Sequence, residues 1–257
     1  TDRTPAICEA LAREHGGRIA YRPGGKNIGI AARTVEALSR CSARYVAICD
    51  SDDIWTDPNK LAKQVGFLET HPDHAFSYTD VDIITREGMH VDADGYQGIR
   101  SRYAGGWLFA QLVQGNFVNN STTVARRDLL EGLRPNACRD ELIGDHVRWI
   151  QLAMRGKAHF LPARTTAYRQ GGVTGQTAIQ QLNRKVMLGM LPGLLREHAS
   201  MRTPTTAADR AILLRKTAGT MLRTGHLSLI PLLFRYLPAV FPSRSPSGGG
   251  PVDSHDT

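Results

Sequence analysis

The stretch that decides the fold reads Tyr45-Val46-Ala47-Ile48-Cys49-Asp50-Ser51-Asp52-Asp53. Its first five residues form a continuous apolar run, which is typical of a strand buried on both faces of a parallel sheet. Helical spacing precedes this run over residues 30–41. After it, Asp57-Pro58 predicts the start of another helix with an apolar stripe of Leu61, Val65 and Leu68.

Strand and helix signals also alternate further out along the chain. Thr4-Pro5 predicts a helix start, Gly16-Gly17 predicts its end, and residues 18–21 are a short strand candidate. Another strand is predicted from Ala75. Helices that recur between buried strands indicate an α/β fold, with a Rossmann-like three-layer α/β/α arrangement and a mostly parallel sheet.

The composition is that of an ordinary globular protein. Of 257 residues, 41% are hydrophobic and 22% charged, which excludes collagen-like, mucin-like and wholly disordered chains. The four cysteines lack paired spacing, so we expect small buried side chains in a reducing compartment rather than disulfides or zinc ligands. No run of 18 apolar residues predicts a membrane-spanning helix, and no signal peptide pattern follows Thr1.

Positive charge is concentrated near the carboxyl end. Ten basic and two acidic residues lie between Arg184 and Arg244, a surplus equal to the net charge of +8 for the whole chain. Composition changes at the same place, from alternating strands and helices to a Leu- and Arg-rich helical pattern. We therefore predict a first domain over residues 1–183, a basic helical region over 184–244 and a disordered tail over 245–257.

The basic region allows three interpretations. Residues 226–241 are rich in Leu, Ile and Phe but are interrupted by Arg235, Pro231 and Pro238, which favours lying along an anionic membrane surface over spanning it. A helical appendage that packs on the sheet with an arginine-rich outer face fits equally well. Nucleic-acid binding is disfavoured, because aromatic residues are few and no binding motif occurs.

The acidic cluster at the end of the apolar run indicates a ligand site. Asp50, Asp52 and Asp53 would repel one another unless a hard cation such as Mg²⁺ or Mn²⁺ shared their oxygens and kept open positions for substrate phosphates. An acidic turn that caps a helix is the structural alternative. An EF-hand is excluded because Trp55 stands where that loop needs glycine, and no Walker-type phosphate loop is present.

Several motifs follow one another over residues 1–170 in an order that resembles glycosyltransferase family 2. They are Asn27-Ile28-Gly29 with Ala32-Arg33, the D-x-D-D pattern after the apolar run, Pro58-Asn59-Lys60-Leu61, Tyr78-Thr79-Asp80-Val81-Asp82, Gly115-Asn116-Phe117 with Ser121-Thr122, Gly144-Asp145-His146-Val147-Arg148-Trp149, and Tyr168-Arg169. The sequence departs from the family pattern at Gly144, where glutamate is usual, and at Thr34, where asparagine is common.

The resemblance implies a GT-A fold and an inverting, metal-assisted transfer from a nucleotide-diphosphate sugar. It implies that Asp52 and Asp53 hold Mg²⁺ or Mn²⁺, that Asp50 orders the strand end or the donor ribose, and that Asp145 is the catalytic base. It further implies donor-binding positions at Asn27, Arg33 and Arg169.

Structural roles remain open for these same residues. Asp145 precedes a helix predicted to run to Arg155 and end at Gly156, so it fits an N-cap as well as a base. The two arginines fit solvated surface positions. Trp55 and Trp107 fit either the core or an acceptor sugar, whereas Trp149 fits the core.

The amino end resembles the later part of the family's first conserved segment. Thr1-Asp2-Arg3-Thr4 matches the end of its S-T-D-x-T pattern. We therefore expect the first strand, its helix and the nucleotide-reading aspartate to be absent. We also expect the chain as given to be inactive or poorly folded.

The sequence thus predicts a cytoplasmic glycosyltransferase of polysaccharide or glycolipid synthesis in the cell envelope. Its expected partners are a nucleotide-diphosphate sugar, a saccharide or lipid-linked acceptor and, at the inner face of the cell membrane, anionic lipid. Two alternatives stand beside this prediction. One is a non-catalytic relative that keeps the fold, and the other is a basic nucleic-acid-associated protein.

Overall fold

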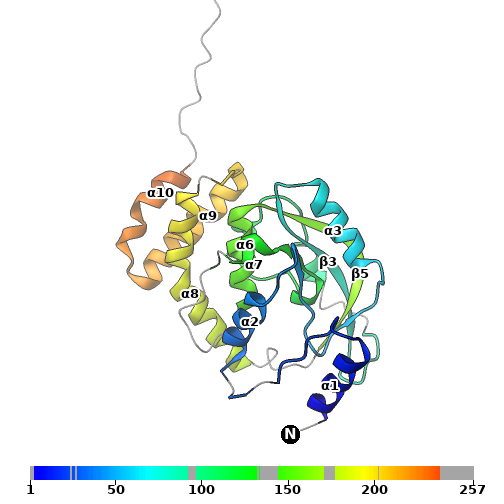
Figure 1. Ribbon diagram of the computed structural model, residues 1–257. Coiled ribbons are helices and arrows are strands. Elements are labelled where there is room, and N and C mark those ends of the chain that lie inside the picture. Colours follow the sequence, from blue (N-terminus) through cyan, green and yellow to red (C-terminus); the bar gives the residue numbers. More distant parts are fainter. Residues whose placement is uncertain are drawn as a thin grey trace, which may run out of the picture.

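A computed structural model describes residues 3–23, 25–26, 28–91, 97–131, 133, 144–170, 177–201 and 203–237. Its centre is a five-stranded sheet with the order β1-β4-β3-β5-β2, surrounded by helices (Figure 1). The strands are β1 Tyr45–Ala47, β2 Ile54–Trp55, β3 His74–Ile84, β4 Val124–Arg126 and β5 Lys157–Arg169. The predicted α/β class is therefore confirmed.

Helices cover the sheet and extend beyond it. The α-helices are α1 Thr4–Glu14, α2 Ile30–Ser39, α3 Lys60–Thr70, α4 Gln97–Arg100, α5 Phe109–Leu112, α6 Arg127–Glu131, α7 Gly144–Arg155, α8 Thr177–Ser200, α9 Ala207–Thr224 and α10 Ile230–Tyr236. Two short 3₁₀ helices, η2 Asn120–Thr122 and η4 Leu227–Leu229, complete the set of named elements.

The sheet is mixed, so the prediction of a mostly parallel sheet is wrong for the described strands. Only β3 and β5 pair in parallel, whereas β1–β4, β3–β4 and β2–β5 are antiparallel. Residues 18–21 form no strand. The apolar run contributes only the three residues of β1, which lies at the edge of the sheet, and of these only Val46 is buried.

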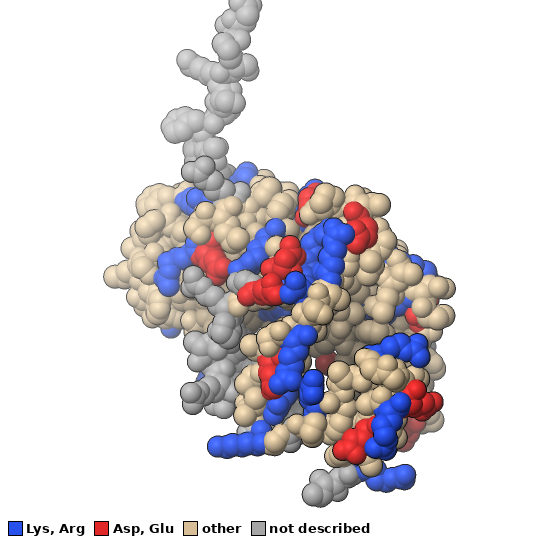
Figure 2. Space-filling model, viewed as in Figure 1, with Lys and Arg blue, Asp and Glu red and all other residues tan. Residues whose placement is uncertain are grey.

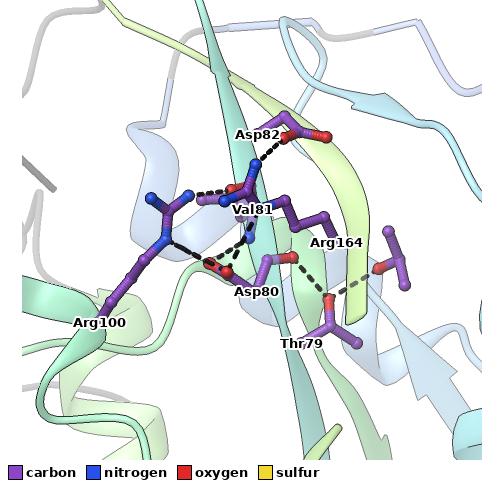
Figure 3. Close-up of polar contacts among 7 residues, drawn as sticks. Thr79, Asp80, Val81, Asp82, Arg100 and Arg164 are labelled. Carbon is purple, nitrogen blue, oxygen red and sulfur yellow. Dashed lines mark hydrogen bonds and ion pairs between the residues drawn. The ribbon is translucent and has the colours of Figure 1, made fainter. Parts of the chain in front are cut away.

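The central β3–β5 pair is bulged, and an ion-pair network surrounds the irregular part (Figure 3). The register shifts on both sides of Asp80. Arg100 Nε donates to both carboxylate oxygens of Asp80 at 3.1 Å, and Arg164 Nη1 donates to Asp82 Oδ1 at 3.0 Å. Because Arg100 ends α4, this network ties α4 to the middle of the sheet.

The two faces of β3 carry different helices. Phe76 stacks on Trp149 of α7 with ring centroids 5.7 Å apart, and the next residue, Ser77, accepts a hydrogen bond from Gln64 of α3 at 3.3 Å. Because successive side chains of a strand point to opposite faces, α7 and α3 lie on opposite sides of the sheet. The core position predicted for Trp149 is confirmed, since the residue is fully buried.

Helix α3 buries a polar face that the sequence did not predict. Lys60, Gln64 and Leu68 are buried, whereas Leu61 of the predicted apolar stripe is exposed. Lys60 Nζ donates to Gln64 Oε1 at 2.8 Å and to the Thr122 carbonyl at 3.2 Å. These partners satisfy the buried ammonium group, which lets the polar face replace an apolar one.

The predicted ends of α1 and α7 agree with the structure. Helix α1 has proline in its first turn and ends just before Gly16-Gly17. Helix α7 ends at Arg155, and a Cβ on Gly156 would lie only 2.9 Å from the Ala75 amide nitrogen. The turn from α7 into β5 therefore requires glycine.

The carboxyl-terminal helices share the core of the sheet domain. Leu195 of α8, Leu213 of α9 and Leu232 of α10 join one hydrophobic cluster with Phe109 of α5. Helix α8 runs through residue 183, the predicted domain boundary, so the division of the chain there stays a prediction. The predicted tail, residues 245–257, lies outside the described residues.

The cysteines differ from their predicted burial. Cys8 and Cys41 are half-buried and Cys49 is exposed, all three as free thiols. Cys138 lies outside the described residues. Cys49 is exposed because it lies just beyond β1, the edge strand of the sheet. There the chain enters the acidic loop, residues 50–53.

Candidate active site

The acidic loop after β1 is held by the 3₁₀ helix η2. The Asp50 amide donates to Ser121 Oγ at 2.8 Å, and Asn120 Nδ2 donates to Asp50 Oδ1 at 2.8 Å. On the far side of the loop, Trp55 Nε1 donates to the Ser121 carbonyl at 2.8 Å. These bonds bring residues about 70 positions apart in the sequence together, and they fix where the Asp50 carboxylate lies.

Asp53 has one carboxylate oxygen bound and one free among the described residues. Its Oδ1 accepts from the Arg169 amide at 3.0 Å, whereas Oδ2 is buried without a hydrogen-bond partner. Burial raises the pKa of Asp53, hydrogen bonds from the Ser121 side chain and the Arg169 amide oppose this, and the negative charges of Asp52 and Asp50 add to the rise. A buried carboxylate oxygen without a donor is suited to a cation.

Arg169 fixes the loop through its backbone and its side chain. Its Nε donates to the Asp52 carbonyl at 2.9 Å, and its Nη1 donates to the carbonyls of Thr85 and Arg86 at 3.0 and 2.7 Å. The Arg169 guanidinium therefore joins the acidic loop to the residues that follow β3. Its predicted contact with the donor stays a prediction.

Asp145 lies in the first turn of α7. Asn116 Nδ2 donates to Asp145 Oδ2 at 3.1 Å. Burial raises the pKa of Asp145, whereas the nearby Arg148 guanidinium lowers it. The charge of Asp145 in turn raises the pKa of Asp50, after the larger effect of partial burial, so the two carboxylates are electrostatic neighbours.

Arg148 is a site residue that the sequence pattern did not single out. Its side chain is buried, at 8% exposure, and Nη1 donates to Asn120 Oδ1 at 3.1 Å. Asn120 thereby links Arg148 to Asp50. The spacing of three residues from Asp145 places both side chains on one face of α7, and this signal was available in the sequence.

The other predicted donor-binding positions lie at the edge of the sheet. Arg33 of α2 pairs with Glu36 at 2.6 Å and lines a groove of about 530 Å³ between α2 and β1. Cys49, the residue before Asp50, also lines this groove. Asn27 lies outside the described residues.

The metal site expected from three shared carboxylates is not formed by the described residues alone. Within the part of the chain that the structure describes, no group of three or more His, Cys, Asp or Glu side chains converges there, because Asp50 accepts from Asn120 while Asp53 accepts from the Arg169 amide. Mg²⁺ is commonly held by one or two carboxylates together with substrate phosphates. Exposed Asp52 and the free Oδ2 of Asp53 fit that arrangement.

Comparison with known proteins identifies the amino-terminal part of the chain. Residues 1–115 match the model of the family described as glycosyl transferase family 2. This part of the chain is therefore similar to that family. Uncharacterized proteins of Mycobacterium tuberculosis and Mycobacterium bovis are 38% identical over 177 residues, which cover 66% of this chain and 47% of theirs. The chain thus spans about half the length of these relatives.

Two named glycosyltransferases are also similar to this chain. A putative teichuronic acid biosynthesis glycosyltransferase of Bacillus subtilis is 39% identical over 67 residues, 26% of each chain. The solved mannosyltransferase of Pyrobaculum calidifontis, in complex with GDP-Man and Mn²⁺, superposes with a TM-score of 0.51 at 17% identity. This match covers 91% of this chain and 67% of the other, and it confirms the predicted GT-A fold.

Proposed function

We propose that this protein transfers a sugar from a nucleotide-diphosphate sugar to an acceptor hydroxyl, with inversion and with a divalent metal, in polysaccharide or glycolipid synthesis. The observation that carries the proposal is the hydrogen-bonded chain from Arg148 through Asn120 to Asp50, which brings the first turn of α7, where Asp145 lies, beside the acidic loop. The family match supports glycosyl transfer. The ligands of the Pyrobaculum mannosyltransferase support the donor class and the metal.

Asp145 would act as the base. An acceptor hydroxyl must lose its proton as its oxygen attacks the anomeric carbon, and a carboxylate beside the acceptor can take that proton. Burial raises the pKa of Asp145 and so makes the carboxylate a stronger base than an exposed aspartate. Asn116 holds one of its oxygens in place.

The acidic loop would bind the donor. Asp52 and Asp53 would hold Mg²⁺ or Mn²⁺, which would offset the negative charge that develops on the leaving diphosphate. Asp50, held by Asn120, would orient the donor ribose. Arg33, with Asn27, would contact the donor from the groove beside β1.

Release of nucleoside diphosphate from a panel of nucleotide sugars, with and without Mn²⁺, tests this function. Metal-dependent turnover by the wild type that is lost in both Asp53→Asn and Asp145→Asn would support this function, and it would overturn the expectation that the chain as given is inactive. Asp128→Asn is the matched control, because Asp128 is an exposed aspartate in the first turn of α6. Donor binding, followed by calorimetry, separates the two roles: Asp53→Asn weakens binding, whereas Asp145→Asn keeps it.

Two outcomes would contradict the proposal. Unchanged turnover in both variants would show that the assigned residues carry no chemistry. Metal-dependent donor binding by the wild type without any turnover would favour the alternative, a relative that keeps the fold without catalysis.

A further inference from the structure

Helix α10 has two apolar faces, and only one of them is covered. Leu232 and Tyr236 are buried against the rest of the molecule, together with Leu229 of the preceding η4. Ile230, Phe234 and Leu237 follow at spacings of four and three residues, so they form a second row along the helix. Packing of the carboxyl-terminal helices explains the first face and leaves the second unexplained.

The second face belongs to a patch of exposed apolar side chains. Leu222, near the end of α9, is 82% exposed, Leu227 of η4 is 69% exposed and Phe234 is 71% exposed. Ile230 and Leu237 are also exposed. We call these five residues, Leu222, Leu227, Ile230, Phe234 and Leu237, the C-terminal apolar patch. Single exposed apolar residues are ordinary, but five of them within residues 222–237 indicate a contact surface.

The cations beside the patch are all arginines. Arg223, Arg235 and Arg196 are exposed, and Arg196 donates to Ser228 within η4 at 3.0 Å. Among the described residues, Arg223 and Arg235 form no ion pair. The lobe of α8 to α10 is at the upper left of Figure 2, where much of the surface is uncharged and Lys and Arg occur in separate groups.

The acidic residues of this region are already engaged. Asp209 is buried in the capping box at the start of α9 and accepts from Gln111 at 2.9 Å. Glu197 lies 3.7 Å from Arg155. Neither carboxylate neutralises the arginines beside the patch, so the patch attracts negative charge.

We propose that the C-terminal apolar patch binds an anionic lipid surface, with its apolar side chains in the headgroup boundary and its arginines on lipid phosphates. Apolar rows rimmed by arginine are typical of segments that lie in a membrane interface. None of the described helices is long and apolar enough to cross a membrane. The contact is therefore a peripheral one, and α10 lies along the surface.

Vesicle sedimentation with the full chain tests this proposal. We expect the protein to pellet with vesicles of equimolar phosphatidylcholine and phosphatidylglycerol, and to stay in the supernatant with phosphatidylcholine alone. Phe234→Gln and Leu227→Gln weaken the binding to anionic vesicles. Arg223→Gln and Arg235→Gln each weaken it roughly five-fold and reduce its dependence on salt. Ile7→Gln and Arg18→Gln on the distant amino-terminal side are matched controls with binding unchanged (Figure 1).

Other results would overturn the proposal. Equal pelleting with neutral and anionic vesicles would remove the role of the arginines. Absence of pelleting, or pelleting that the Phe234 and Leu227 variants leave unchanged, would remove the role of the patch. Self-association that Phe234→Gln abolishes, in a chain that does not bind vesicles, would show that the patch joins two copies of the protein.

Discussion

The candidate active site and the C-terminal apolar patch break opposite rules of burial. At the site, charged side chains are partly or largely buried, namely Asp53, Asp145 and Arg148. At the patch, Leu222 and Phe234 leave large apolar side chains in water. Each arrangement costs stability or solubility relative to the ordinary choice. Substitutions in the two regions should therefore change activity and the free energy of unfolding by different amounts. Measuring both quantities separates an effect on function from an effect on folding.

The largest effect is expected at Asp145. Asp145→Asn should lower turnover by about 10²–10⁴-fold, because the amide cannot take the acceptor proton. The free energy of unfolding of Asp145→Asn should instead rise. The raised pKa of Asp145 means that the folded protein loses stability as pH rises through it, and asparagine removes that loss. Denaturant unfolding at acid and neutral pH measures this gain, which should be greater at neutral pH.

A destabilised Asp145→Asn protein at neutral pH would contradict this view of the site. It would mean that the ionised carboxylate contributes to folding as an N-cap, the structural alternative for this residue. Asp128→Asn again serves as the control, since its carboxylate is exposed and lies outside the site.

Lys60 gives the next largest effect, and it depends on pH. Burial lowers the pKa of Lys60 to about 8. The folded protein then binds fewer protons here than the unfolded chain, so stability from this residue rises between pH 8 and the ordinary lysine pKa. The slope is at most about 1.4 kcal/mol per pH unit. Unfolding measured against pH should lose this slope in Lys60→Met and keep it in Lys63→Met, an exposed position of the same helix.

An identical pH dependence of stability in the wild type and Lys60→Met would contradict the buried ammonium. It would show that Lys60 reaches water in solution. The comparison between the two variants cancels the contributions of other groups that ionise at alkaline pH.

Local signals in the sequence predicted local structure well. The proline at the start of α1 and the glycine after α7 act within one turn of the chain, and both helix ends agree with prediction. The apolar run before Asp50 predicted a strand but not its position, because hydrophobicity does not say how many neighbours a strand has. The burial of Lys60 depends on Thr122, which is 62 residues away, so no pattern within α3 contains it.

The candidate site divides in the same way. Asp50, Asp53 and Asp145 stand within motifs that resemble a known family, so they were nominated from the sequence. Asn120 is recognised as a site residue only from the hydrogen bonds that join two distant segments, and these bonds also give Arg148 a role that its spacing from Asp145 alone does not show. The patch was foreseen as a basic and apolar region, but its exposed row depends on which face of α10 is covered.

Arg148 should give a smaller effect than Asp145. Its charge lowers the pKa of Asp145 and of Asp50, so Arg148→Gln should raise both. The acid limb of turnover then moves to higher pH, and each pH unit of displacement lowers the rate below that limb about tenfold. A pH profile of turnover measures the shift. Arg148→Lys keeps the charge and should restore most of it, whereas equal profiles for the two variants would assign Arg148 to packing alone.

The smallest effect on folding is expected at the patch. Phe234→Gln should change the free energy of unfolding by less than about 0.5 kcal/mol, because this side chain is mostly in water already. Leu229→Ala, on the covered side of the same hairpin, should cost about 2–5 kcal/mol because it leaves a cavity. Chemical denaturation measures both values. A large loss in Phe234→Gln would place its ring in the core and remove it from the surface offered to lipid, whereas a small one beside weakened vesicle binding would separate the two faces of α10.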